Sequence, residues 1–215
     1  MKKIIDLKDL LKYEILDLYS AEEQIIEGLP DMIEKANDAK LKRVLSNHLE
    51  VSKIHKDRLD KIKETIMSGE DIGESKGFFS NLFGGSNTVT SKGIEGLIKE
   101  AGKMMNEDMT PQAMDAAIIA VAQKIEHYEI AGYGTVRAYA SELKLDFVTT
   151  ELEKILREEY DADDLLTKLA VGQVNPDAEM AIDDDDQENT NESDYDRLTN
   201  SVSIMSSSDS SEDDE

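Results

Sequence analysis

Apolar residues in the first third of the chain recur at three- and four-residue steps. The pattern runs through residues 4–32 and starts again over residues 41–66. One face of an α-helix has this spacing, so the sequence predicts two long amphipathic helices. Asn37 or Asp38 lies between the two segments and is expected to cap the second helix.

Three more helices are predicted in the second half. Residues 68–91 are rich in glycine, serine and asparagine, which predicts a long crossover loop. Helical spacing then returns, and the expected helices span residues 92–106, 112–143 and 147–171. Thr110 and Pro111 suit the N-cap and first position of the second of these helices, and Asp146 is expected to cap the third.

The predicted fold class is all-α. Four long helices, one extra short helix and a crossover loop are typical of a four-helix bundle with one long connection. No alternation of apolar and polar residues indicates a strand. The segment AAIIAVAQKIEHYEIAGYGTVRAYA is rich in small residues that let helices approach closely, so its helix is expected at the centre.

Charge divides the chain into two predicted regions, a bundle over residues 1–172 and an acidic tail over residues 173–215. The formal net charge is -24, with 48 acidic and 24 basic residues. About -14 of this charge falls within the last 40 residues, which predicts disorder there. The acidic surface argues against nucleic acid and against anionic lipid, and a basic protein is the expected partner of the tail.

Neither a membrane segment nor a signal peptide is expected. No apolar run approaches the roughly 20 residues that span a bilayer. Asp6, Lys8 and Asp9 interrupt the apolar start of the chain, so a cytoplasmic location is predicted. The chain has no cysteine, which excludes thiolate metal sites and cysteine nucleophiles. Any metal site must therefore use oxygen and imidazole ligands.

Polar residues on the inward helix faces are the main indication of chemistry. The second helix places His48, Ser52 and His55 on its apolar stripe. Acids and histidines on or beside the inward faces of the four long helices are Glu14, Glu22, His48, Glu50, His55, Glu126, His127, Glu129, Glu158, Glu159 and Asp163. An unpaired buried carboxylate costs several kcal/mol, which a pair of bound metal ions would offset.

The spacing fits a di-iron bundle in part. Such bundles take a Glu from each of two helices and a Glu-x-x-His from each of the other two. Glu126 and Glu129 lie one turn apart and can reach a shared centre. Ser52 stands where the Glu of the second-helix motif is wanted, and the last helix offers Glu159 and Asp163 but no histidine.

Four segments resemble the YciF/YciE-type ferritin-like family of small bacterial stress-associated proteins. They are DLYSAEEQII, EGLIKEA, AAIIAVAQKIEHYEIAGYGT and LREEYDADDLLTKLA, and the likeness spans residues 4–172. The resemblance implies a ferritin-like bundle with a dinuclear iron or manganese site. EHYE also resembles the Glu-x-x-Glu of rubrerythrins. The implied metal ligands are Glu22, Glu50, His55, Glu126, Glu129, Glu159 and Asp163.

Two functions remain open. One is a stress protein that oxidises iron or handles peroxide, as a ferroxidase-like oxidoreductase. The other is a non-catalytic structural or interaction bundle, in which the buried charges pair with one another and no metal binds. His48 is interpreted as a structural histidine. A homo-oligomer, a dimer first, is the expected assembly.

Overall fold

Helices make up nearly all of the chain that the structure describes. The structure is a computed structural model, and it describes residues 4–68 and 89–181. The elements are α1 (Leu7–Lys35), α2 (Ala39–Ser68), α4 (Lys92–Met104), α5 (Pro111–Glu142), α6 (Asp146–Leu169), the short π-helix η1 (Ala170–Val174) and α7 (Asn175–Glu179). These residues contain no strand, and the predicted all-α class is confirmed.

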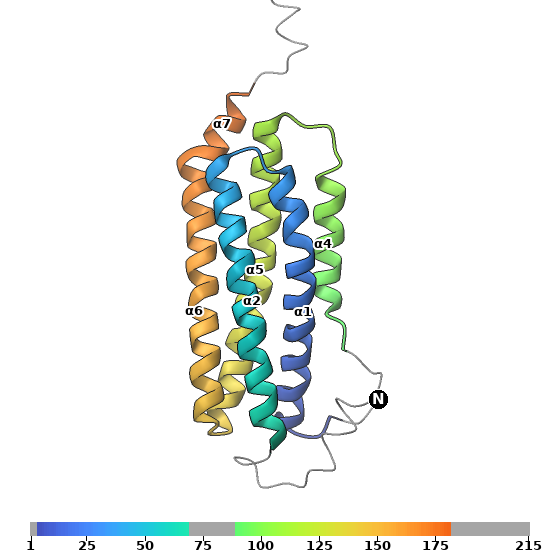
Figure 1. The fold of residues 1–215 in the computed structure, drawn as a ribbon, viewed down its shortest axis with the longest axis vertical. Coiled ribbons are helices and arrows are strands. Elements are labelled where there is room, and N and C mark those ends of the chain that lie inside the picture. Colours follow the sequence, from blue (N-terminus) through green and yellow to red (C-terminus); the bar gives the residue numbers. More distant parts are fainter. Residues whose placement is uncertain (1–3, 69–88, 182–215) are drawn as a thin grey trace, which may run out of the picture. The chain divides into compact units, whose positions relative to one another are not determined.

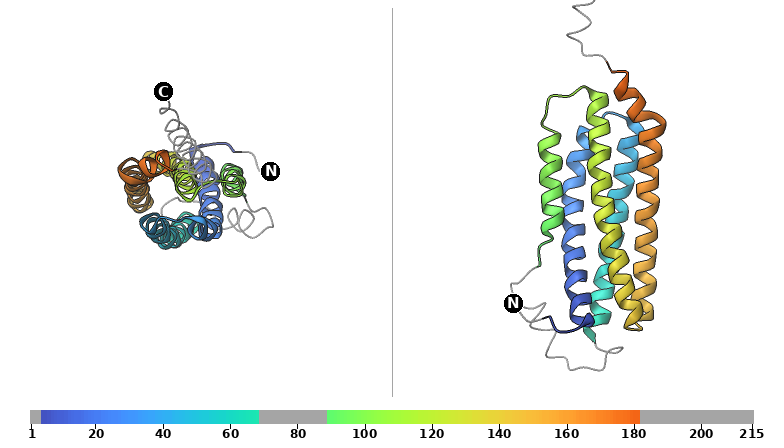
Figure 2. Two further views of the ribbon diagram at one scale, coloured as in Figure 1. Left: turned by 90° about the horizontal axis from the view of Figure 1, so that it is seen from above. Right: turned by 180° about the vertical axis from the view of Figure 1, so that it is seen from behind.

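Helices α1, α2, α5 and α6 form a bundle, and α4 lies outside it against α1 and α5 (Figure 1). Helices α1 and α6 run in one direction and α2 and α5 in the other (Figure 2). Because α2 and α5 are parallel, the chain must return along the bundle between them, and α4 makes part of that return. The ferritin-like bundle with one extra short helix is thus confirmed, although most of the predicted crossover loop, residues 69–88, lies outside the described residues.

Two of the three predicted helix starts are confirmed. The Asp38 side chain accepts hydrogen bonds from two backbone amides at the start of α2. The Thr110 hydroxyl accepts one at the start of α5, with Pro111 as the first helical residue. The prediction for Asp146 was wrong, because it is the first residue of α6. Leu145 holds the N-cap position, since its side chain is buried in the core.

The helical part continues beyond residue 172, through η1 and α7 to Glu179. Val174 is buried, and Gln173 Nε2 donates a hydrogen bond to Asp38 Oδ2 at 2.7 Å. These contacts attach the end of α6 to the turn between α1 and α2. The predicted acidic tail from residue 182 onward lies outside the described residues.

The core consists of two apolar clusters with a polar layer between them. On α5, the first cluster ends at Ile125 and the second begins at Tyr133. Glu126 and Glu129 lie between these two residues and are both buried. The same interruption occurs on α2 and α6, and Glu22 is buried beside Ala21 on α1, so polar residues of four helices meet at one level of the bundle.

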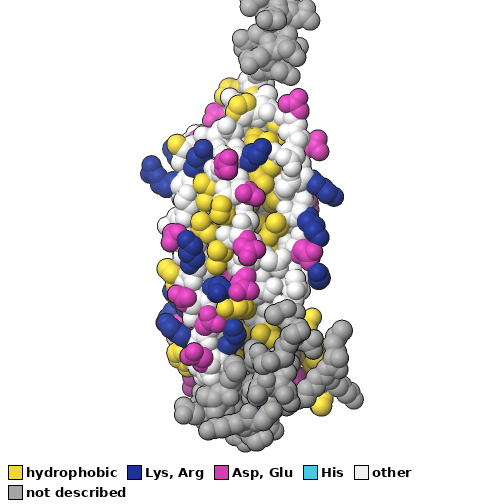
Figure 3. Space-filling model, turned by 45° about the vertical axis from the view of Figure 1, so that its right-hand side comes forward, with side chains coloured by type: hydrophobic (Ala, Val, Ile, Leu, Met, Phe, Trp, Pro, Cys, Tyr) yellow, Lys and Arg dark blue, Asp and Glu magenta, His cyan; other side chains and the backbone are white. Residues whose placement is uncertain are grey.

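Small residues let α5 approach its neighbours, as the sequence predicts. A Cβ at Gly132 would lie 2.7 Å from Leu18 Cδ2 on α1, so even an alanine there would force the Leu18 side chain to move. Charged side chains of both signs cover the face drawn in Figure 3. Among the described residues, no helix has the length and apolar character needed to cross a membrane.

Candidate metal centre

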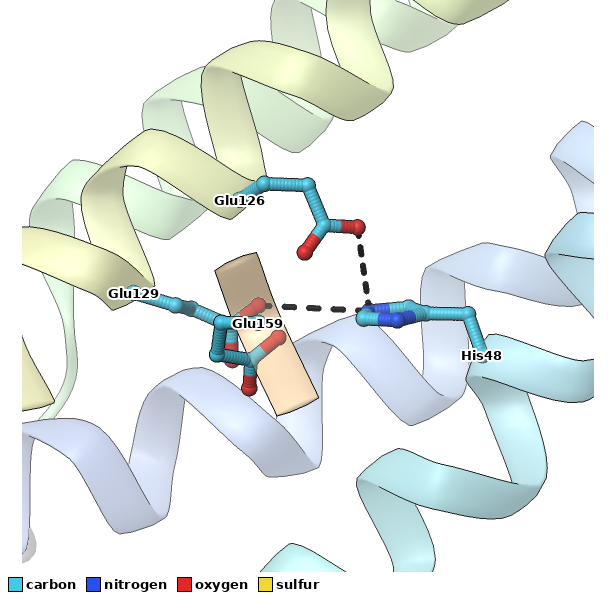
Figure 4. A group of neighbouring side chains, drawn as sticks. All are labelled: His48, Glu126, Glu129 and Glu159. Atoms are coloured by element: carbon cyan, nitrogen blue, oxygen red, sulfur yellow. Dashed lines mark ion pairs between the residues drawn. The ribbon is translucent and has the colours of Figure 1, made fainter. Parts of the chain in front are cut away.

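Six side chains from the four bundle helices meet in the polar layer. Their ligand atoms form two groups, within each of which the atoms lie within 4.8 Å of one another. The first group is His48, Glu126, Glu129 and Glu159, and the second is Glu22, His55 and Glu159 (Figure 4 shows the first). Glu159 belongs to both groups, so the two are adjacent and share a carboxylate.

The helical repeat explains how two histidines of one helix serve two groups. His48 and His55 are seven residues apart, which is close to two turns of α2, so they lie on the same face at different heights. Glu126 and Glu129 are one turn apart on α5 and both point inward. The seven residues between His48 and His55 therefore set the separation of the two groups along the bundle axis.

All six side chains are buried, and many of their polar atoms have no hydrogen-bond partner. His48 is 7% exposed, and the other five are 2% exposed or less. The atoms without a partner are Glu22 Oε2, His48 Nε2, His55 Nδ1, Glu126 Oε2, both carboxylate oxygens of Glu129 and both of Glu159. Buried polar atoms are almost always satisfied, so a cluster of exceptions at one place indicates a binding site.

His55 is held between the centre and an outer ion pair. Its Nδ1 lies 3.2 Å from Glu22 Oε1 and 2.9 Å from Glu159 Oε1, without hydrogen-bond geometry to either. Its Nε2 lies 2.8 Å from Glu158 Oε2, and Glu158 also accepts hydrogen bonds from Arg58. A carboxylate that takes the outer N–H of a histidine leaves the inner nitrogen facing a metal, as in many metal sites.

Burial and mutual repulsion set the protonation of the metal-free centre. Burial and the nearby Glu159 carboxylate raise the pKa of Glu126 and of Glu129 well above the ordinary value. Burial lowers the pKa of His48. Burial also lowers the pKa of His55, but the nearby carboxylates of Glu159 and Glu22 have the larger effect and raise this pKa to about 10. Without metal, the centre therefore retains protons at neutral pH.

Tyr133 supports one carboxylate of the centre. Its hydroxyl donates a hydrogen bond to Glu22 Oε1 at 2.5 Å, and the side chain is fully buried. Its ring also makes an edge contact with the imidazole of His55, with 6.2 Å between the ring centroids. Tyr133 thus fixes the position of Glu22 and packs the second apolar cluster at the same time.

Comparison with known proteins places the chain in a family. The sequence profile of a family described as a domain of unknown function (DUF892) matches residues 6–179. The chain belongs to the DUF892 family. It is 33% identical to protein YciF of Escherichia coli (strain K12) over 173 residues, which cover 80% of this chain and 95% of that protein. The resemblance found in the sequence is therefore confirmed.

Two solved structures of relatives share the fold. The crystal structure of the E. coli stress protein YciF matches with a TM-score of 0.68 and 31% identity, over 80% of this chain and 99% of that one. YcfI from Rhodopseudomonas palustris matches with a TM-score of 0.66 and 37% identity, over 77% of this chain and 96% of that one. Both matches cover more than three quarters of this chain, so the fold of these relatives is also the fold of this protein.

The structure brings together five of the seven ligands implied by the resemblance, and it places two elsewhere. The five are Glu22, His55, Glu126, Glu129 and Glu159. Glu50 is exposed and bonded to Lys53 at 2.6 Å, since two residues along a helix turn a side chain by about 200° from His48. Asp163 is half-buried and accepts a hydrogen bond from Gln123 at 3.0 Å.

His48, interpreted from the sequence as structural, lies in the first group. Its Nε2 is 3.4 Å from Glu126 Oε1 and 4.0 Å from Glu129 Oε2 (Figure 4). The signal in the sequence was its place seven residues before His55 on the same stripe. A second histidine on one inward face is a weak signal, because satisfied core histidines have the same spacing.

With His48 included, the donor set equals that of a di-iron bundle. Glutamates from two helices and two Glu-x-x-His motifs amount to four carboxylates and two imidazoles. Here α2 carries Ser52 in place of the motif glutamate, and α6 carries Ala162 in place of the motif histidine. Glu129 of α5 provides the fourth carboxylate, and His48 of α2 provides the second imidazole. In this chain the candidate donor atoms are thus distributed differently among the helices.

Proposed function

We propose that the centre binds two divalent transition-metal ions, iron or manganese, and that the protein uses them in iron oxidation or peroxide chemistry. One observation carries this proposal. Carboxylate and imidazole atoms from four helices are buried together without hydrogen-bond partners. Such atoms destabilise a protein unless a cation or protons compensate them.

The charge and the kind of ligand both suit such a pair. Four carboxylates carry a formal charge of about -4 when ionised, which two divalent cations neutralise. Carboxylates suit hard ions such as manganese, and imidazoles suit iron and its neighbours in the series. The absence of cysteine excludes the thiolates that softer ions prefer.

Each residue has a separate part in the proposed site. Glu159 lies in both groups and would hold the two ions side by side, while His48 and His55 would each bind one. Glu158 and Arg58 keep the outer nitrogen of His55 occupied. The apolar clusters above and below limit the access of water. Two iron(II) ions held there would supply the two electrons that reduction of dioxygen or peroxide requires.

A role in the stress response is also proposed for this chain. It rests on the E. coli relative, which is described as a stress protein and whose entire bundle aligns with this one. Removal of iron(II) or peroxide is a chemistry that suits such a role. The proposed activity and the proposed role are separate claims, and only the first depends on the centre.

The test is anaerobic loading of metal-free protein with Fe(II), followed by measurement of bound iron and of oxidation by dioxygen or peroxide. Wild type is compared with Glu126→Ala combined with Glu129→Ala, and with Glu50→Ala as a matched control. We expect stoichiometric iron and rapid oxidation in wild type and in the control, and neither in the double variant. Absence of iron from wild type, or full activity in the double variant, contradicts the proposal.

The second candidate is a non-catalytic bundle that binds no metal. The raised pKa values of Glu126, Glu129 and His55 favour it, because retained protons compensate part of the buried charge. This candidate expects a thermal midpoint that does not respond to Fe(II), Mn(II) or Zn(II). A ligand that binds only the folded state must raise the midpoint, so a rise at micromolar metal rejects the candidate.

The proposed partners are a second copy of this chain and a basic protein. Residues 182–215 of the tail that would bind the basic protein lie outside the described residues. Sedimentation of the purified protein tests the dimer. A pull-down with the full chain and with a chain lacking residues 176–215 tests the basic partner, and equal capture by both chains contradicts it.

A further inference from the structure

A groove between α2 and α6 leads from the surface to the centre. It encloses about 200 Å³. Two of the residues lining it, His48 and Glu126, are buried ligands of the first group. Asn47 and Asp161, which are exposed, line it nearer the solvent. The groove thus joins solvent to one of the two groups and not to the second.

Ala162 is the residue that leaves this groove open. It lies on α6 one turn after Glu159 and lines the groove with a single methyl group. A histidine at this position would fill the space and add a ligand. The redistribution of ligands described above therefore has a second effect, because it leaves an opening where the ligand is missing.

The lining of the groove suits a cation. His48 and Glu126 line it, and each has a buried polar atom without a hydrogen-bond partner, His48 Nε2 and Glu126 Oε2. Glu158 and Asp161 also line it, and Arg58 pairs with the first of these. No lysine or arginine is among the residues that line it. An acidic passage raises the local concentration of cations and speeds their association.

A second cavity reaches the same two ligands from the opposite side, beneath α4. It encloses about 60 Å³, and apolar side chains such as Leu29, Met32 and Ile98 form most of its lining. Its acidic lining residues are Asp31 and Glu126, whereas the groove has Glu126, Glu158 and Asp161, so a hydrated cation would find fewer oxygens here to replace its water. The smaller cavity is therefore the less favourable route for a cation.

We propose that divalent cations reach the centre through the groove between α2 and α6, and that His48 and Glu126 are the first ligands they meet. This inference rests on the proposed function, because it assumes that the centre binds metal. It adds the route and makes Ala162 and Asp161 determinants of the rate of uptake, although neither is a ligand.

The first test blocks each route in turn. Uptake of Co(II) by metal-free protein is followed by stopped-flow absorbance for wild type, Ala162→Leu and Gly102→Leu. Gly102 lines the cavity beneath α4, and a Cβ there meets no atom within 4 Å. We expect Ala162→Leu to slow uptake about tenfold or more, because a filled interior leaves no gap wider than water. The final stoichiometry should not change, and Gly102→Leu should match wild type.

The second test uses charge and does not depend on how Ala162→Leu folds. Asp161→Lys places a cation at the groove, and Asp164→Lys makes the same change at an exposed position of α6 outside it. We expect Asp161→Lys to slow Co(II) uptake about threefold or more at low salt, with the difference shrinking as salt rises. Asp164→Lys should change the rate much less.

The outcomes separate the route from the site. Wild-type protein that binds no Co(II) overturns both the proposed function and the route. Wild-type binding with unchanged rates in Ala162→Leu and Asp161→Lys overturns the route alone. Slow uptake in Gly102→Leu, with normal uptake in Ala162→Leu, also overturns it and assigns uptake to the cavity beneath α4.

Discussion

Two buried carboxylates on the same helix show opposite environments. Asp115, near the start of α5, accepts hydrogen bonds from the backbone amides of Asn37 at 2.6 Å and Asp38 at 2.8 Å. Glu129, farther along α5, is fully buried, and neither of its oxygens has a hydrogen-bond partner among the described residues. The first carboxylate is satisfied by the fold itself, and the second is not.

The difference separates a structural acid from a candidate metal ligand. Asp115 joins the turn between α1 and α2 to the start of α5, so its charge stabilises the fold. Glu129 faces other carboxylates, and burial together with the charges of Glu159 and Glu22 raises its pKa. Its environment favours a cation or a proton over the bare charge. Burial of an acid alone therefore does not identify its role, but its hydrogen-bond partners do.

The largest effect on stability is expected from Asp115→Asn. The amide can accept a hydrogen bond through its oxygen, but its NH₂ group would face a partly buried backbone N–H. A buried donor left unsatisfied costs about 1–3 kcal/mol, so unfolding in urea should show a loss of about 2 kcal/mol or more. Metal content should stay at the wild-type level. A loss below about 0.5 kcal/mol would show that Asp115 is not the structural acid of the pair.

The next effect concerns metal affinity in Glu158→Gln. Glu158 does not belong to either ligand group, but it takes the outer nitrogen of His55. Loss of such an outer partner typically weakens metal binding about 10- to 100-fold. Competition with a chelator measures the affinity, and Glu153→Gln, an exposed change on the same helix, is the control. Equal metal affinities in the two variants would show that Glu158 does not support metal binding by His55.

Stabilisation by metal should increase with pH. In the metal-free protein the raised pKa values of Glu126, Glu129 and His55 mean that the folded state holds protons the unfolded state has released. Stability from these groups is therefore present at low pH and is lost as pH rises from the ordinary carboxylate range toward about 10. Metal displaces the same protons, so its apparent affinity rises with pH.

Thermal midpoints with and without Mn(II) at pH 6 and pH 8 measure this effect. Each displaced proton contributes up to about 1.4 kcal/mol per pH unit. The rise in the midpoint caused by Mn(II) should be larger at the higher pH. A rise that is equal or smaller at pH 8 would mean that metal does not compete with these protons.

The smallest effect is expected from Glu129→Gln in the metal-free protein. Like Asp115→Asn, it replaces a carboxyl group with an amide, but the carboxyl group of Glu129 has no hydrogen-bond partner to lose among the described residues, and burial raises its pKa. Replacement of a poorly compensated buried charge is often neutral or stabilising, so the free energy of unfolding should stay within about 1 kcal/mol of wild type. A loss as large as that of Asp115→Asn would make Glu129 a structural acid as well.

Much of the fold could be predicted from the sequence, because helical stripes and caps are local patterns. The start of α6 could not, since burial of Leu145 decides it and burial depends on the whole bundle. The centre was predicted as far as its ligands lie on inward stripes. Glu50 lies outside both groups because its side chain turns outward, and His48 was not chosen because satisfied core histidines have the same spacing.

The central claim is that the unpartnered atoms of the polar layer hold two cations. Titration of metal-free protein with Mn(II), followed by the electron paramagnetic resonance signal of the unbound ion, tests it most directly. We predict about two tightly bound ions per chain in wild type and fewer than about one in Glu159→Ala, which lacks the shared carboxylate. Wild-type protein that leaves all Mn(II) unbound, or a Glu159→Ala variant that still binds two ions, would contradict the account.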